Sequence, residues 1–66
     1  MDRDALLAEI DSFRSRVSIS ETAIGLGAVN DGKFVSELRA GRRCWPETAQ
    51  KVLDFIGGYE REARAA

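Results

Sequence analysis

The chain has 66 residues, of which 44% are hydrophobic and 32% charged, and its formal net charge is −1. This length and composition indicate a single folded domain, residues 1–66, and exclude a disordered tail. One cysteine and no histidine exclude an internal disulfide and the common structural zinc sites. There is no apolar run long enough to span a membrane, and the acidic, polar start is unlike a signal peptide. We therefore expect a cytoplasmic protein without a metal or a cofactor.

The first predicted helix covers residues 4–16. Asp2 or Asp4 is suited to cap its start. Apolar residues recur through it at three- and four-residue spacings: Leu6, Leu7, Ile10, Phe13 and Val17. The opposite face carries charges of both signs, which is typical of a helix packed on a globular core and not of a helix lying on a membrane.

Two short helices are predicted next, at 20–27 and 32–40, with a turn between them. Ser20 is a good N-cap for the first of them, and Gly27 is suited to end it. Asn30-Asp31-Gly32 is a turn signal before the second. Neither helix can bury a core alone, so we expect them to pack on each other and on the surrounding helices.

The apolar faces of these two helices define how they pack. In the first, Ala23 and Leu26 are expected to face inward, and Gly25 to permit close approach where the two short helices cross. In the second, three apolar residues share one face that must be buried: Phe34, Val35 and Leu38. Gly41 follows this helix and is expected to end it.

The last helix is predicted to begin at Pro46 and to reach residue 57, with a buried stripe of Ala49, Val52, Leu53 and Ile56. Gly57-Gly58 leaves two possibilities open, a separate fifth helix at 59–65 or one helix that continues. Phe55 and Tyr59 are the best candidates for a self-association surface. The expected core consists of Phe13, Ala23, Leu26, Val35, Leu38, Val52 and Ile56.

The charge distribution points to a partner. Between Gly32 and Pro46 there are four cations, Lys33, Arg39, Arg42 and Arg43, against one acid, Glu37. A polar, basic second helix held rigidly by a first is what reading DNA in the major groove requires. Double-stranded DNA is therefore the predicted partner, although the overall charge is slightly negative.

Residues on and around the second short helix receive predicted roles. Those on or beside its polar face are assigned to base edges: Lys33, Ser36, Glu37 and Arg39. Those at the helix ends and after Gly41 are assigned to phosphates: Ser20, Thr22, Asn30, Arg42 and Arg43. For Glu37, an intrahelical pair with Lys33 is an equal alternative. Trp45 either packs across a helix junction or presents its indole to a phosphate or a second protomer.

The same stretch resembles the helix-turn-helix domain of phage-repressor and Cro type, in the XRE-like group of small transcriptional regulators. Ala23, Gly27, Val35 and Leu38 carry the resemblance, together with the exit Gly41-Arg42-Arg43 and the following Pro46 and Thr48. Gly27 to Val35 is two residues longer than the usual spacing, which implies a longer turn. The resemblance implies an all-α, compact four- to five-helix lambda-repressor-like domain that binds DNA sequence-specifically in the nucleoid.

No arrangement of residues indicates catalysis. Cys44 has no histidine to activate it, and Gly25-Leu26-Gly27 lacks the lysine-serine pair of a phosphate-binding loop. We expect no enzymatic activity, and we expect a homodimer, because dimers gain affinity from two half-sites. The alternative function is a small helical protein-interaction module without DNA binding. An excisionase-like or antitoxin role also stays open.

Overall fold

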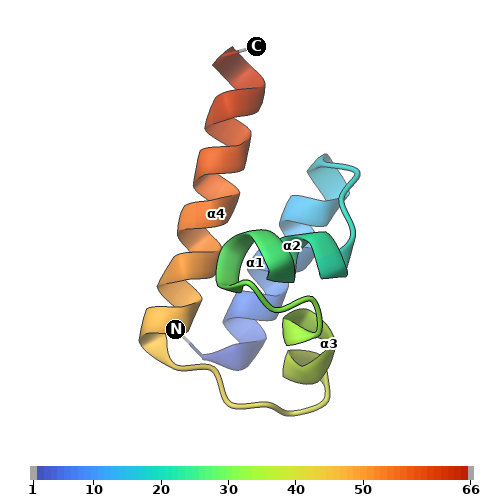
Figure 1. Ribbon diagram of the computed structural model, residues 1–66, viewed down its shortest axis with the longest axis vertical. Helices are drawn as coiled ribbons and strands as arrows, with labels where there is room; N and C mark the ends of the chain where they lie inside the picture. Colours follow the sequence, from blue (N-terminus) through green and yellow to red (C-terminus); the bar gives the residue numbers. More distant parts are fainter. Residues whose placement is uncertain (1, 66) are drawn as a thin grey trace.

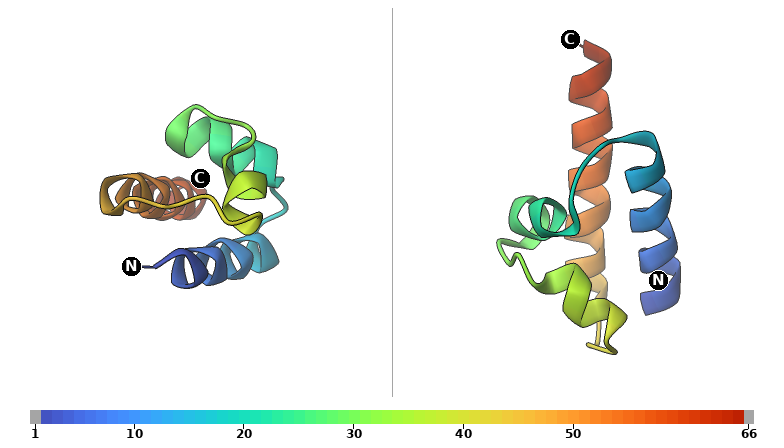
Figure 2. Two further views of the ribbon diagram at one scale, coloured as in Figure 1. Left: turned by 90° about the horizontal axis from the view of Figure 1, so that it is seen from below. Right: turned by 90° about the vertical axis from the view of Figure 1, so that its right-hand side faces the viewer.

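The computed structural model describes residues 2–65, which form four α-helices and no strand. α1 covers Arg3–Arg16, α2 Glu21–Val29, α3 Phe34–Arg39 and α4 Pro46–Ala65. α1 and α4 run side by side in the same direction, α2 packs across α4, and α3 lies near the N-terminal ends of α1 and α4 (Figures 1 and 2). The all-α architecture is confirmed. None of the described helices is long and apolar enough to cross a membrane.

The predicted starts of α1 and α2 agree with the structure. Asp2 caps α1, since its Oδ1 accepts a hydrogen bond from the Ala5 backbone N–H at 2.7 Å. Ser20 caps α2 in the same way, with 3.0 Å between its Oγ and the Ala23 nitrogen. A short polar side chain in extended backbone satisfies one of the free amides at a helix N-terminus, so both caps fix where a helix begins.

The predicted end of α2 at Gly27 is wrong. The helix continues to Val29, and Asn30 adopts the left-handed conformation with φ of 56°. Asparagine is one of the few residues besides glycine that tolerates this backbone. Gly27 has a different role: a Cβ built on it would lie 2.4 Å from Cε2 of Phe55 on α4. It is a glycine because α2 and the Phe55 ring approach each other there.

α3 is shorter than the predicted 32–40 and consists of six residues. Its start is fixed by Asp31, whose Oδ1 accepts from the Lys33 backbone N–H at 3.0 Å, while Lys33 itself makes no side-chain cap. Gly41 follows α3 with φ of 113°, where a side chain would be strained, which confirms it as the stop.

α4 continues through Gly57-Gly58 as one helix of 20 residues, which settles the possibility that the sequence left open. Its second half is held on α1 by two contacts. The rings of Phe13 and Tyr59 meet edge to face with 5.5 Å between centroids, and Arg16 forms an ion pair with Glu60 at 2.9 Å. These contacts favour the straight helix over a break at the glycines.

The core joins all four helices. Its fully or almost fully buried members are Leu6, Ile10, Phe13, Ile24, Phe34, Val35, Leu38, Ala49, Val52 and Ile56. Two predicted members are wrong: Ala23 is exposed, and Leu26 is 53% exposed. Ile24 and Gly25 are buried in their place, so α2 is rotated from the predicted face. The error arose because α2 contains small and apolar residues on every side, so its periodicity does not define one face.

Candidate nucleic-acid interface

The outward face of α3 is exposed, as its apolar pattern predicts. Phe34, Val35 and Leu38 are at most 1% exposed and anchor α3 in the core. Ser36 and Glu37 point away from that core and are exposed, as is Lys33 just before the helix. These three residues are available to a ligand that approaches α3 from outside.

Arg39 lies on a different side of α3, toward α1 and α2. Its Nε donates to Oε2 of Glu21 at 2.8 Å, and its Nη2 donates to Asp11. Glu21 also accepts from Arg14 at 3.2 Å. Arg39 therefore ties α3 to the start of α2 and the middle of α1. The hydrogen bond from Arg39 lowers the pKa of Asp11, which keeps this carboxylate charged.

Arg42 folds back onto the turn and α3. Its Nη1 lies 2.9 Å from Oδ2 of Asp31 and 2.8 Å from Oε1 of Glu37, and its guanidinium lies over the Phe34 ring at 5.3 Å from the centroid. The hydrogen bond to Asp31 is the main cause that raises the pKa of Arg42. Among the ion pairs of the described residues, Glu37 pairs with Arg42, and the pair with Lys33 that was one alternative for Glu37 is not formed.

Arg43 and Trp45 form an exposed pair in the loop after α3. The guanidinium of Arg43 lies 5.2 Å from the centroid of the Trp45 ring, and Trp45 is 60% exposed. The prediction that Trp45 packs across a helix junction is therefore wrong. Cys44 between them is half-buried, and this burial raises the pKa of its thiol, which favours the unreactive protonated form.

The remaining predicted phosphate contacts lie on α2 and its ends. Ser20 uses its hydroxyl as the helix cap, and Thr22 is exposed in the first turn of the helix. Asn30 is exposed at the opposite end of α2. A Cβ built on Gly32 would lie 3.1 Å from the Thr22 methyl carbon, so Thr22 lies beside the turn before α3.

The local positive charge predicted from the sequence is largely compensated. Two of the four cations, Arg39 and Arg42, are each held by two carboxylates. Three of those carboxylates come from outside α3: Asp11, Glu21 and Asp31. The sequence predicts none of these three carboxylates at the interface. Asp31 adjoins the motif and could have been found, but Asp11 and Glu21 lie 28 and 18 residues from Arg39 along the chain.

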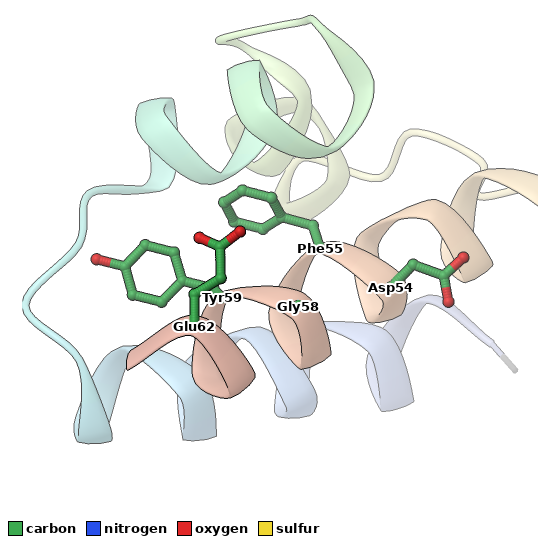
Figure 3. Close-up of a pocket in the computed structure, with 5 residues that line it drawn as sticks. All are labelled: Asp54, Phe55, Gly58, Tyr59 and Glu62. Atoms are coloured by element: carbon green, nitrogen blue, oxygen red, sulfur yellow. The ribbon is translucent and has the colours of Figure 1, made fainter. Parts of the chain in front are cut away.

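A second surface feature lies on α4, away from α3. Asp54, Phe55, Gly58, Tyr59 and Glu62 line a shallow groove of about 210 Å³ (Figure 3). The rings of Phe55 and Tyr59 form its apolar part, with 6.0 Å between centroids, and two carboxylates border it. In the described residues, no group of three or more histidine, cysteine or acidic side chains could hold a metal ion.

Comparisons with protein-family models, with curated protein sequences and with solved structures found no match to the chain.

Proposed function

We propose that the protein binds double-stranded DNA through α2 and α3 and acts as a small transcriptional regulator. The observation that carries this proposal is the way in which α3 is held on the other helices. Its apolar face is fully buried, Arg39 ties it to two other helices, and its outward residues are exposed. A short polar helix that is held rigidly and presented at the surface suits insertion into a major groove.

The contact between α2 and the turn supports the resemblance to phage repressors, with a shifted correspondence. Gly25, not Ala23, is the small residue at this contact, because a Cβ on it would lie 2.2 Å from the Asp31 carbonyl oxygen and 3.4 Å from Cβ of Phe34. Gly25 lies two residues nearer to Val35 than Ala23 does, which removes the two-residue excess in the spacing. The turn position then falls on Val29, the last residue of α2, and the left-handed residue is the next one, Asn30.

We assign base readout to Lys33, Ser36 and Glu37, which lie on the exposed side of α3. Lysine can donate to guanine, glutamate can accept from the cytosine amino group, and serine can do either. Arg39 can read a base only by leaving Asp11 and Glu21, so we assign it first to positioning α3.

Phosphate contacts are assigned to the residues that flank α3 and the ends of α2: Ser20, Thr22, Asn30, Arg42 and Arg43. Arg43 is the best placed of the cations, because its charge has no carboxylate partner in the described part of the chain and is presented on an exposed tryptophan. One α3 spans few base pairs, so the proposed working unit is a homodimer on two half-sites about 34 Å apart.

Selection of bound sites from random duplex DNA tests this proposal. We expect enrichment of one motif and a steep loss of affinity with salt, because phosphate contacts release counterions. A protein-interaction module is the alternative, and the exposed Leu26, Trp45 and Tyr59 are the observation in its favour. These residues lie on α2, a loop and α4 and not on one element, so we prefer DNA. Selection that enriches no sequence would decide for the alternative.

A further inference from the structure

Arg42 is surrounded by acceptors that belong to the protein itself. Asp31 approaches from the turn and Glu37 from α3, and both contact the same Nη1 atom. The backbone supports this arrangement, since the Arg42 N–H donates to the Glu37 carbonyl at 2.9 Å. A phosphate that approaches Arg42 must therefore compete with carboxylates that are already in place.

The two carboxylates differ in how firmly they are held. Asp31 is fixed, because its other oxygen, Oδ1, accepts from the Lys33 backbone N–H. Glu37 has Arg42 as its only side-chain partner among the described residues, and its side chain is 52% exposed. Glu37 can therefore leave Arg42 by a change of rotamer, whereas Asp31 cannot leave without releasing the turn.

We propose that Glu37 sets sequence specificity by exchanging Arg42 for a base. This inference rests on the proposed DNA binding. In the free protein, and on a wrong sequence, Glu37 and Asp31 together hold Arg42 and weaken its attraction to the phosphate. On the right sequence, Glu37 accepts a hydrogen bond from a cytosine amino group, and Arg42, left with Asp31 alone at its Nη1, can bind the adjacent phosphate through the other nitrogens of its guanidinium. One side chain thus couples base recognition to backbone affinity.

The coupling makes an unusual prediction for Glu37→Gln. The variant loses the charge that holds Arg42, so its affinity for a scrambled duplex should rise about two- to fivefold, the range expected for releasing an exposed ion pair. The dependence of log affinity on log salt should steepen by about one, because one more phosphate is neutralised. Affinity for the selected motif should rise less, so discrimination between the two duplexes falls.

Glu9→Gln is the matched control. Glu9 is exposed on α1, forms no ion pair in the described part of the chain, and gives the same change in net charge. Asp31→Asn is the second variant, since it keeps the Oδ1 acceptor for the Lys33 N–H and removes the charge beside Arg42. It should raise affinity for scrambled DNA as Glu37→Gln does, but leave the preference for cytosine intact.

Binding is measured by fluorescence anisotropy on selected and scrambled duplexes at several salt concentrations, for each variant alone and combined with Arg42→Gln. In the Arg42→Gln background, Glu37→Gln should affect scrambled DNA no more than Glu9→Gln does. If the wild type binds its motif but Glu37→Gln behaves like Glu9→Gln in both backgrounds, the coupling is wrong and DNA binding stands. If neither the wild type nor Glu37→Gln binds any duplex, both proposals are wrong.

Discussion

At the scale of single residues, glycines mark where α2 touches its neighbours. Gly25 lies against the Asp31 backbone carbonyl, which cannot move without displacing the turn before α3. Gly57 is also helical, but a Cβ there would meet nothing within 4 Å. The two positions therefore separate the packing effect of a glycine from its intrinsic cost in a helix.

We expect opposite effects from the same substitution at these two sites. Gly25→Ala should destabilise the protein by about 1–3 kcal/mol, as overpacking does in other cores. Gly57→Ala should stabilise it by about 0.5–1 kcal/mol, because alanine is the better helix former. Urea unfolding followed by circular dichroism measures both. Equal effects at the two sites would show that α2 and the turn are not packed as described.

The carboxylates paired with arginines also predict how stability depends on pH. Hydrogen bonds from Arg39 and Arg42 lower the pKa of Asp11 and of Asp31, respectively, from the ordinary value of 3.8. A lowered folded-state pKa gives stability that is present above the unfolded value and is lost as pH falls through the folded value. The free energy of unfolding should therefore decrease below about pH 4.

Asp11→Asn isolates one part of this dependence. The variant should be less stable than the wild type at neutral pH and should lose less on acidification, so the two stability curves converge at low pH. The effect is modest because Asp11 is exposed. Urea unfolding between about pH 2 and pH 7 provides the comparison. Parallel curves would mean that the Arg39–Asp11 pair does not contribute to stability in solution.

At the scale of elements, α3 is too short to be stable alone and depends on its contacts with the other helices. The buried Phe34, Val35 and Leu38 supply one attachment, and Arg39 supplies another across α1 and α2. A planar guanidinium with several donors can bridge two carboxylates, which a lysine ammonium on its flexible stem does less well.

Arg39→Ala should therefore lower stability by about 1 kcal/mol, the sum expected for two partly exposed pairs, and Arg39→Lys should lower it by less. Lys51→Ala is the control, because Lys51 is exposed on α4 and forms no ion pair in the described residues. Thermal unfolding measures the stability, and fluorescence anisotropy measures binding to the selected and the scrambled duplex. A positioning role of Arg39 requires loss of affinity for both duplexes. A loss of affinity for the selected motif alone would show that Arg39 contacts a base.

Local signals predicted most of the elements, and their failures have physical causes. Asp2, Ser20, Pro46 and Gly41 act on their own neighbours in the chain, so caps and stops could be predicted. The end of α2 could not be predicted, because Gly27 does not end the helix. The space at Gly27 is limited by the Phe55 ring on α4, a residue distant in sequence. The continuity of α4 likewise depends on contacts with α1.

At the scale of the whole molecule, pairing between distant residues redistributes the charge. The sequence shows a basic stretch from Gly32 to Pro46, and its exposed residues on α3 were predicted. The carboxylates of Asp11 and Glu21 reach this stretch only through the packing of α1 and α2. The interface is thus less cationic than the sequence suggests, and we expect weak binding to non-specific DNA.

We propose the projecting end of α4 as the contact surface of the expected homodimer (Figure 1). Asp54 and Arg61 are exposed and lie seven residues apart, so they share one face of the helix, on either side of Gly57-Gly58. Two α4 helices packed antiparallel about these glycines would place each Asp54 opposite the Arg61 of the other protomer. Such a contact is self-complementary, as a two-fold interface requires. The glycines admit close approach, since neither has an atom within 4 Å of the Cβ position.

Charge reversal tests this homodimer. Asp54→Arg should weaken self-association, because it places arginines opposite each other, and the double variant Asp54→Arg/Arg61→Asp should restore it by exchanging the partners. Glu9→Arg, at an exposed position of α1, is the control for net charge. Sedimentation equilibrium of the free protein and of its complex with a two-half-site duplex measures the association. The α4 contact is identified if Asp54→Arg weakens the association, Glu9→Arg does not, and the double variant restores it. Glu9→Arg is needed because it changes the net charge as much as Asp54→Arg does, whereas the double variant returns the net charge to that of the wild type. A monomer in both conditions, or a dimer unaffected by all three variants, would mean that α4 is not the contact between protomers.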